Sequence, residues 1–324
     1  MVSYISELMI KLSIIVPVYN VAELVQKCVD SLLCQDIPLE EYEVLLINDG
    51  STDKSLQIIE NLAHKYLNIK VYSKPNGGQS SARNLGLENA LGKYVWFVDS
   101  DDFIEPNVLS KVLGKIEKDE LDVLCFSFQF SYDDGTEFSS HKFHASENKV
   151  CSGNDFQLKV NMPAGPWAAI FSRSFINDNK LRFIEGIVHE DLEYTARAYY
   201  LAKRIEFYDI VVYNYYQRLG STMKSNNFKR AHDLLVVSDA LYTFAEENVE
   251  KTKPIYQLFQ NKVLFAFSQA LFYYQKTGTL TLKTFKSKPY YPIRLNSTMT
   301  NKEKLKALIM NVSLRLYIKL ICRH

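Results

Sequence analysis

Two hydrophobic periods alternate along the first 130 residues of the chain. Short, nearly continuous apolar runs are typical of strands buried on both faces, whereas apolar residues at every third or fourth position indicate one face of a helix. The apolar runs predict strands at 12–18, 44–47, 69–72, 94–98 and 122–130. Helical periodicity lies between the first four, at 25–33, 56–66 and 80–91. This alternation predicts right-handed crossover units, a largely parallel sheet and an α/β fold.

Polar clusters follow four of these strands. In open parallel sheets the ligand crevice lies beyond the carboxyl ends of the strands. The clusters are Tyr19-Asn20, Asn48-Asp49, Lys74-Pro75-Asn76 and the run from Asp99 to Asp102. We expect all four to converge on one edge of the sheet.

The pattern weakens from about residue 130 and becomes helical near residue 228. Residues 228–276 predict helix, with Pro254 as the expected break, and 277–300 predict a loop or linker. In the last segment, 302–324, six apolar residues share one helical face: Leu305, Leu308, Ile309, Val312, Leu316 and Leu320. Another face carries a basic ridge of Arg315, Lys319 and Arg323. Such a helix suits an anionic membrane surface and equally suits packing on its own domain.

Composition narrows the class of protein. With 324 residues, of which 47% are hydrophobic and 23% charged, the chain can form about two domains with a buried core. Its 38 Lys and Arg against 37 Asp and Glu argue against a nucleic-acid-binding protein, which is normally strongly basic. The five cysteines lack C-x-x-C spacing and predict neither a disulfide framework nor a zinc site. No signal peptide or membrane-spanning run is readable, so we expect a cytoplasmic protein.

The run Asp99-Ser100-Asp101-Asp102 directly follows the strand predicted at 94–98. Three carboxylates within four residues repel one another unless a cation or hydrogen bonds offset their charge. Carboxylate oxygens suit Mg²⁺ or Mn²⁺, which leave positions open for the phosphates of a substrate. An isolated acidic turn more often caps the next helix. Its place at the carboxyl end of a strand favours the metal site here.

Asp49 lies in the turn at 48–53, after the second predicted strand. A fixed carboxylate there can accept a hydrogen bond from a base, such as N3–H of uracil, or can be an ordinary turn residue that starts a helix. Pro17 and Tyr19, at the end of the first strand, would give that base a rigid wall and an aromatic ring. Ordinary strand-end packing is the alternative for both residues.

Residues 76–84, Asn-Gly-Gly-Gln-Ser-Ser-Ala-Arg-Asn, are glycine-rich but match neither common phosphate-binding loop. They lack the Gly-Lys-Ser/Thr ending of a P-loop and the G-x-G-x-x-G of a dinucleotide fingerprint. This argues against an NTPase or a nicotinamide enzyme. Arg83 falls near the start of the next helix, where its guanidinium can bind phosphate or stabilise the aspartate run.

Three further segments carry candidate chemistry. Glu190 and Asp191 follow His189 at the start of a predicted helix. One of these acids can act as a general base on an acceptor hydroxyl, or both can stabilise the helix N-terminus. Arg218 can reach a diphosphate or be a surface cation on an edge strand. Trp167 can stack on a sugar, although a lone tryptophan more often lies in the core.

Five ordered motifs together resemble the family 2 (GT-A type) nucleotide-sugar glycosyltransferases of bacteria. They are Val-Pro-Val-Tyr-Asn at 16–20, Asn-Asp-Gly-Ser-Thr-Asp at 48–53, the glycine-rich segment at 76–84, the segment 92–102, and Glu190-Asp191. The resemblance covers residues 11–220. One departure is Trp167-Ala168-Ala169, where members of the family often have Trp-Asn-Lys. We therefore assign no donor or acceptor contact to that segment.

The resemblance implies roles for individual residues. The uracil of a UDP-sugar is held by Pro17, Tyr19 and Asp49, with Arg83 nearby. Asp101 is the implied direct ligand of Mn²⁺ or Mg²⁺, and Asp99 faces ribose or metal. Asp191 is the implied catalytic base, with Glu190 as the alternative. The other residues implied in nucleotide-sugar binding are Asn76, Ser100, Arg218 and Ser221.

The resemblance also implies the architecture: a GT-A domain at 9–225, which is a Rossmann-like, mostly parallel sheet flanked by helices, with a C-terminal helical extension. The helical region at 226–300 would make acceptor or oligomer contacts, and 301–324 would be a basic amphipathic tail. The implied function is inverting transfer of a hexosyl or N-acetylhexosaminyl group from a UDP-sugar to a glycan or lipid-linked acceptor in surface polysaccharide synthesis. The tail at 302–324 would then place the enzyme peripherally on the inner face of the cell membrane.

Two alternative functions stay open. One is a catalytically silent protein that binds nucleotide-sugars on the same fold, although Asp99, Asp101 and Asp191 are all intact. The other is a sugar-phosphate nucleotidyltransferase. That enzyme would need a glycine-rich, basic loop after the first strand, where this chain has Tyr-Asn-Val-Ala at 19–22.

Overall fold

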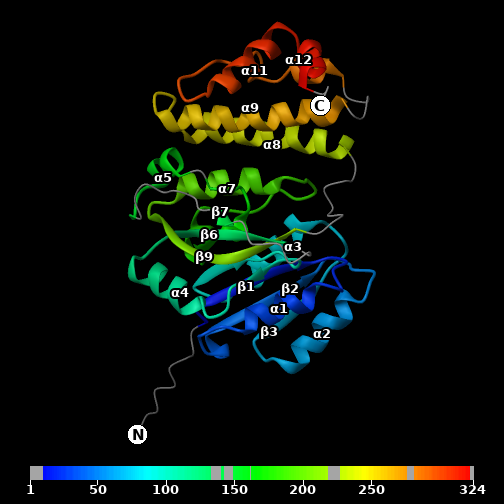
Figure 1. The fold of residues 1–324 in the computed structure, drawn as a ribbon, viewed down its shortest axis with the longest axis vertical. Helices are drawn as coiled ribbons and strands as arrows, with labels where there is room; N and C mark the ends of the chain where they lie inside the picture. Colours follow the sequence, from blue (N-terminus) through cyan, green and yellow to red (C-terminus); the bar gives the residue numbers. More distant parts are fainter. Residues whose placement is uncertain are drawn as a thin grey trace. The chain divides into compact units, whose positions relative to one another are not determined.

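The computed structural model describes residues 10–132, 140–141, 149–160, 162–217, 227–275 and 281–321. The chain falls into two compact units. The first comprises Met1–Gly186 and Arg197–Ser221, and the second comprises Ile187–Ala196 and Thr222–His324. The first unit contains the sheet and the second contains the C-terminal helices (Figure 1).

Strands and helices alternate in the first unit as the hydrophobic pattern predicts. Its strands are β1 (Leu12–Val18), β2 (Tyr42–Asn48), β3 (Ile69–Ser73), β4 (Tyr94–Phe97), β5 (Phe103–Ile104), β6 (Val123–Tyr132), β7 (Ser140–His141), β8 (Ala169–Ser172) and β9 (Ile205–Gln217). Its helices are α1 (Val25–Leu33), α2 (Ser55–Lys65), α3 (Gln79–Asn89), α4 (Leu109–Lys118), α5 (Gly153–Lys159) and α6 (Arg173–Asp178). Helix α7 (Glu190–Leu201) begins in the second unit and ends in the first. The five strands and three helices predicted from sequence are all present.

The described strands form one sheet in the order β3-β2-β1-β4-β8-β6-β9-β5, and β7 pairs with β6. Strands β3, β2, β1 and β4 pair in parallel, as predicted. Strand β8 runs antiparallel to both β4 and β6, so the whole sheet is mixed. Sequence reading missed β8 because four residues after a turn at Pro166–Ala168 give little periodicity.

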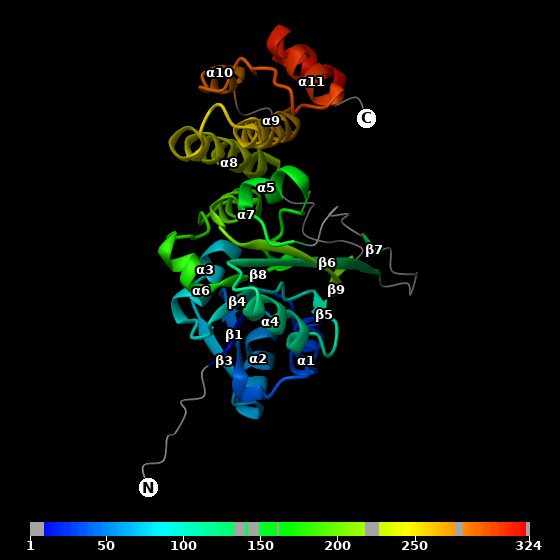
Figure 2. The same cartoon turned by 90° about the vertical axis from the view of Figure 1, so that its left-hand side faces the viewer.

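Helices cover both faces of the sheet (Figure 2). Alternate residues of β1, such as Ile14 and Val16, share one core cluster with residues of α1, α2 and α4. Ile15 points to the opposite face, where α3 packs. A Cβ atom on Gly86 of α3 would lie 2.3 Å from Cγ2 of Ile15. Glycine at this position therefore lets α3 lie close against β1.

The second unit is helical in the part that the structure describes. Its helices are α8 (Asn227–Asn248), α9 (Pro254–Gln275), α10 (Leu282–Lys286), α11 (Asn301–Val312) and α12 (Leu314–Ile321), together with the first residues of α7. Helices α8 and α9 form a hairpin with a short connection, and α9 begins at Pro254, where we expected a break. Proline suits the first turn of a helix, whose N–H groups lack helical partners. The predicted linker contains the short helix α10.

The tail differs from the single helix expected at 302–324. It consists of α11 and α12 with Ser313 between them, and α11 begins with a capping box of Thr300 and Glu303. The predicted apolar row is mostly exposed: 58% for Leu305, 48% for Leu308, 78% for Val312, 42% for Leu316 and 51% for Leu320. The tail packs instead through Ala307, Met310, Leu314 and Tyr317, which are buried. Most of this row of large apolar side chains is therefore left exposed by the described residues of its own unit.

Among the described residues, the structure has neither a membrane-spanning helix nor a disulfide bond. None of the helices traced in the structure is both long and apolar enough to span a bilayer. The cysteines within the described ranges, Cys28, Cys34, Cys125 and Cys151, are all free thiols.

Candidate functional site

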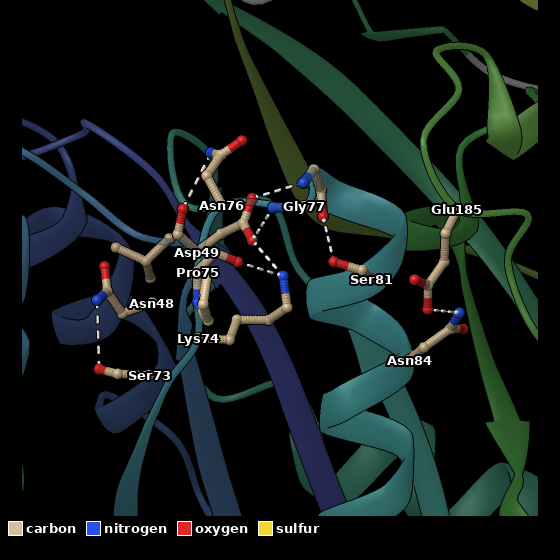
Figure 3. Close-up of polar contacts among 12 residues, drawn as sticks. Asn48, Asp49, Ser73, Lys74, Pro75, Asn76, Gly77, Ser81, Asn84 and Glu185 are labelled. Carbon is tan, nitrogen blue, oxygen red and sulfur yellow. Dashed lines mark hydrogen bonds and ion pairs between the residues drawn. The ribbon is translucent and has the colours of Figure 1, made fainter.

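Asp49, at the carboxyl end of β2, holds the connection between β3 and α3 (Figure 3). Its Oδ1 accepts hydrogen bonds from the Gly77 N–H at 2.9 Å and from Lys74 Nζ at 2.7 Å, and the second contact is also an ion pair. Its Oδ2 accepts the Gly78 N–H at 2.7 Å. An ionised carboxylate offers about four acceptor positions, so these three contacts leave room for one more donor. The Asp49 side chain is therefore fixed, buried and still able to accept a hydrogen bond.

The backbone around Asp49 is equally constrained. Nδ2 of Asn76 donates to the Asp49 carbonyl at 3.0 Å. Gly50 has a φ of +71°, and a Cβ there would lie 2.8 Å from the backbone nitrogen of Asn76. Only glycine fits both the left-handed conformation and this close approach. The loop after β2 and the loop before α3 are thus packed backbone against backbone.

Helix α3 begins directly after this loop, and two of its side chains contact Asp99, which follows β4. Arg83 Nη2 lies 2.7 Å from Asp99 Oδ1, and Gln79 Nε2 donates to the same oxygen at 2.7 Å. The Arg83 side chain is only 2% exposed, whereas that of Asp99 is 18% exposed. A continuous chain of bonded residues therefore runs from Asp49 through Gly78 and α3 to Asp99.

Asp102 is buried, and its hydrogen bonds link the aspartate run to β9. Its Oδ2 accepts a hydrogen bond from the Tyr213 hydroxyl at 2.6 Å, and its Oδ1 accepts the Tyr216 N–H at 2.8 Å. The Tyr213 hydroxyl in turn accepts the Asp99 N–H at 3.2 Å. Burial, reinforced by the charges of Asp99 and Asp101, raises the pKa of Asp102 well above its usual value. Sequence analysis missed the pairing of Asp102 with Tyr213, since nothing in the local pattern links residues 111 apart.

Asp101 lies beside these groups, partly exposed, and its charge helps to raise the pKa of Asp102. Among the described residues, no group of three or more His, Cys, Asp or Glu side chains could hold a metal ion. Mg²⁺ and similar ions in nucleotide sites are commonly held by one or two carboxylates together with substrate phosphates. Asp101 and the accessible part of Asp99 fit that smaller donor set, whereas Asp102 is turned inward and does not belong to it.

The four polar clusters converge at one edge of the sheet, as expected. Asn20 Oδ1 accepts the Thr52 N–H at 2.8 Å, which joins the loops after β1 and β2. Pro17 is buried in β1, and Tyr19 is 48% exposed, so its ring is accessible beside this edge. Asp49 contacts the cluster at 74–76, and the helix that follows this cluster contacts Asp99.

Other predicted site residues lie in different surroundings. Ser100 is buried in the turn after β4. Trp167 belongs to the core, where its ring stacks on Tyr213 at 4.7 Å between centroids and its carbonyl accepts the Trp96 Nε1–H at 2.8 Å. Arg218 and Ser221 lie outside the described residues.

Helix α3 also anchors the segment that leads toward Glu190 and Asp191. The Asn84 side chain donates to the Phe183 carbonyl and to Glu185 Oε1, both at 3.0 Å, and accepts the Phe183 N–H at 2.9 Å. The contact with Glu185 is drawn in Figure 3. Asn84 lies in the same motif as Arg83, so one helix fixes both the aspartate run and this segment.

Glu190 and Asp191 themselves lie in the second unit, at the N-terminus of α7. Glu190 is 7% exposed and Asp191 is half-buried. His189, just before them, has a φ of +66°, which is strained for a residue other than glycine. Burial, reinforced by Arg230, lowers the pKa of His189. Asp233 of α8 accepts the Val188 N–H at 2.9 Å and so ties the start of this motif to the helical unit.

Comparison with known proteins identifies the family. The sequence profile of glycosyl transferase family 2 matches residues 13–179, just over half of the chain. The chain therefore belongs to glycosyl transferase family 2.

Two curated relatives illustrate the range of similarity. The uncharacterized glycosyltransferase YibD of Escherichia coli K12 is 32% identical over 64% of this chain and 61% of its own length. The poly(ribitol-phosphate) β-N-acetylglucosaminyltransferase TarS of Staphylococcus aureus is 34% identical over 67% of this chain and 37% of its own length. The chain thus spans less than two thirds of each of these relatives.

Solved structures confirm the GT-A fold. The crystal structure of S. aureus TarS 1-349 in complex with UDP-GlcNAc has a TM-score of 0.62 at 24% identity, covering 94% of this chain and 82% of that one. The mannosyltransferase PcManGT from Pyrobaculum calidifontis, in complex with GDP-Man and Mn²⁺, has a TM-score of 0.54 at 16% identity, covering 95% and 85%. At these identities the similarity concerns the fold.

Proposed function

We propose that this protein transfers a sugar from a UDP-sugar to a hydroxyl group of a glycan or lipid-linked acceptor, with inversion at the anomeric carbon. The observation that carries the proposal is the bonded chain from Asp49 through Gly78, Gln79 and Arg83 to Asp99. These contacts bring Asp49, whose carboxylate can bind a nucleobase, close to the acidic and partly accessible turn after β4. Both lie at the carboxyl edge of the parallel part of the sheet. Such edges are where nucleotides bind in folds of this kind.

Uracil recognition would use the remaining acceptor position of Asp49. Because Asp49 is buried and held by three donors, it can accept N3–H of the base without rearranging. Tyr19 and Pro17 would contact the faces of the base. The UDP-GlcNAc bound by the structural neighbour TarS supports UDP as the nucleotide. Asn76, Ser100, Arg218 and Ser221 remain proposed contacts of the nucleotide-sugar.

Asp101, helped by Asp99, would hold Mn²⁺ or Mg²⁺. When bound, such an ion offsets the negative charge that grows on the diphosphate as the sugar leaves. Arg83 and Gln79 would keep the Asp99 carboxylate in one orientation through their bonds to its Oδ1. Asp102 would hold the turn in place from its buried side. The Mn²⁺ bound by the neighbour PcManGT supports this choice of ion.

Asp191 would be the general base, with Glu190 as the alternative. Its carboxylate would take the proton of the acceptor hydroxyl while that oxygen forms a bond to the anomeric carbon. The bond from the anomeric carbon to the UDP oxygen breaks at the same time, and its electron pair leaves with the diphosphate. Attack on the face opposite the leaving group inverts the configuration. The partial exposure of Asp191 favours it over the more buried Glu190.

The proposal also covers the acceptor and the location of the enzyme in the cell. Residues 226–300 would contact the acceptor or a second copy of the chain. The exposed apolar row of α11 and α12 is accompanied by Lys302, Lys304, Lys306, Arg315 and Lys319, against the single acid Glu303. Apolar and basic side chains together suit the surface of an anionic membrane. A peripheral enzyme on the inner face of the cell membrane could reach lipid-linked acceptors for surface polysaccharides.

A thermal-shift panel tests the donor assignment. UDP-, GDP-, CMP- and dTDP-sugars are each added with and without Mn²⁺, because binding to the native state raises the melting temperature. We expect the largest shift for a UDP-sugar, and a larger shift with the ion than without it. A shift that is equal for all four nucleotides, or independent of the ion, would refute the proposed donor site.

A further inference from the structure

The second unit contains a cavity of about 390 Å³ bounded by α8, α9 and the segment that follows α10. Its volume lies within the range of about 300–1,000 Å³ that is usual for small-molecule sites. The buried part of its lining is apolar and includes Ala245, Val263, Leu264 and Met299, none more than 4% exposed. All lining residues belong to this one unit, so the cavity does not depend on the nucleotide site.

Three tyrosines form part of the wall. The rings of Tyr242 and Tyr290 lie 5.4 Å apart between centroids, and the Tyr290 hydroxyl donates to Asp239 Oδ1 at 3.0 Å. The hydroxyl of Tyr256 donates to Glu246. Burial raises the pKa of Tyr256 to about 12, so its hydroxyl stays neutral. Tyr256 and Tyr290 are therefore held by bonds to carboxylates, and Tyr242 packs against the ring of Tyr290 in the cavity wall.

The cavity is lined by three charged side chains, Glu246, Lys251 and Arg294. Lys251 Nζ contacts Glu246 Oε2 at 2.7 Å, and this contact, followed by the hydrogen bond from Tyr256, lowers the pKa of Glu246. Arg294 also lines the cavity and is exposed, yet it makes no hydrogen bond or ion pair with any residue that the structure describes. Both Lys251 and Arg294 act on the single carboxylate of Glu246, whose pKa they help to lower, so the charged lining carries one positive charge in excess.

We propose that this cavity binds a sugar ring that carries a negatively charged group, with the ring packed on Tyr242 and Tyr290 and the anion on Arg294. The apolar faces of a sugar suit aromatic rings, and its hydroxyls can bond to Glu246 and to the tyrosine hydroxyls. A guanidinium binds phosphate or carboxylate through paired N–H groups. An alkyl chain would offer the Arg294 guanidinium no counter-charge and the hydroxyl groups of the wall no hydrogen bond.

On the proposed transferase function, this ligand would be a charged unit of the acceptor other than the one that reacts. A polymer held at a second position stays near the active enzyme between transfers, because linked binding sites raise the effective concentration. The cavity would then favour long, anionic acceptors over short or neutral ones.

Ligand-observed NMR on the full chain tests this site. Excess UDP with Mg²⁺ is present throughout, so that the donor site is occupied. Glucose 6-phosphate, methyl glucoside and inorganic phosphate are the probes. We expect glucose 6-phosphate to bind most tightly, and Arg294→Ala to weaken it about tenfold, as expected for the loss of one charge-assisted contact. Lys253→Ala is the matched control, because Lys253 is an exposed cation nearby that does not line the cavity.

Tyr242→Leu provides a second variant that keeps apolar volume but removes the ring. It should weaken glucose 6-phosphate and leave inorganic phosphate unchanged. Three results would overturn the proposal: equal binding to wild type and Arg294→Ala, inorganic phosphate binding as tightly as the sugar phosphate, or displacement of the probe by further UDP. Calorimetry with UDP alone, run on each variant, tests the donor site separately, so a failure of either proposal is recognised by itself.

Discussion

Tyr213 in β9 donates its hydroxyl hydrogen bond to Asp102, 111 residues earlier in the chain, at 2.6 Å. The same hydroxyl accepts the N–H of Asp99, so one phenol group supports both ends of the aspartate run. Strand β9 continues to Gln217, just before the segment that holds Arg218 and Ser221. The position of the proposed metal-binding turn therefore depends on a strand far away in sequence.

Tyr213→Phe should destabilise the protein in a pH-dependent way. The variant keeps the ring that stacks on Trp167 but removes one of the two hydrogen bonds that the buried Asp102 accepts, a loss of about 1–3 kcal/mol in the free energy of unfolding. Asp102 is an acid whose pKa is raised in the folded state, so its native form binds more protons and its contribution to stability falls as the pH rises through that pKa. Without the hydroxyl, the ionised form is even less favourable, and the loss should grow with pH.

Chemical denaturation from about pH 4 to about pH 9 measures this effect. Tyr208→Phe, in the same strand, is the control, because the Tyr208 hydroxyl makes no hydrogen bond within the described residues. A loss for Tyr213→Phe that is constant with pH, or matched by the control, would show that Asp102 does not depend on this hydroxyl.

Asp49→Asn should weaken both folding and nucleotide binding. Asparagine has one acceptor oxygen, so it cannot accept from Gly77, Gly78 and Lys74 together and also from a base. We expect a stability loss of about 1–3 kcal/mol and a UDP dissociation constant about tenfold higher or more. Calorimetric titration with UDP measures the second effect. Asp30→Asn, at an exposed aspartate of α1 that bonds Gln26, should change neither quantity, and an equal response of both variants would refute the role of Asp49.

Asp191→Asn and Glu190→Gln separate the two candidate bases. Loss of a general base lowers turnover by about a hundredfold to ten-thousandfold. We expect Asp191→Asn to lower kcat by that amount while the UDP dissociation constant stays unchanged, and Glu190→Gln to have a smaller effect. Initial rates at saturating donor, together with calorimetry, measure both quantities. The opposite ranking would assign the base to Glu190, and lost binding in Asp191→Asn with normal turnover of the bound fraction would refute a catalytic role.

The exposed row of α11 and α12 should direct the protein to anionic lipid. Leu308→Glu with Val312→Glu places acids at two exposed apolar positions, where folding should be unaffected. We expect wild type to sediment with vesicles of phosphatidylcholine and phosphatidylglycerol, less so at high salt, and the double variant to stay in solution. Leu67→Glu, at a fully exposed leucine of the first unit, is the control. Equal sedimentation of wild type with neutral vesicles, or of the double variant with anionic ones, would contradict the membrane role.

The sequence was most informative where chemistry and structure are local. Strands such as Leu12–Val18 are nearly uninterrupted apolar runs, and the rule that ligands bind at the carboxyl ends of parallel strands correctly predicts that Asp49 and Asp99 lie at one edge of the sheet. The bonds of Gln79 and Arg83 to Asp99 follow from α3 starting directly after the glycine-rich loop.

Long-range pairing could not be predicted in the same way. The burial of Asp102 depends on β9, whose position beside β5 and β6 is decided by the whole sheet. Trp167 lies in the core because the ring of Tyr213 stacks on it, again a contact distant in sequence. In the tail, periodicity identified a face of leucines, but Ala307, Met310, Leu314 and Tyr317 on another face are the residues that pack. A periodic pattern defines faces without specifying which one meets a partner.

The proposed sugar transfer depends most directly on metal-assisted binding of UDP at the turn after β4. Calorimetric titration of UDP with and without Mn²⁺, on wild type and on Asp101→Ala, tests this dependence. We predict that Mn²⁺ tightens UDP binding to wild type about tenfold or more, and that Asp101→Ala removes this gain while binding in the absence of the ion stays the same. Equal affinity with and without the ion in wild type, or an undiminished gain in Asp101→Ala, would contradict the account.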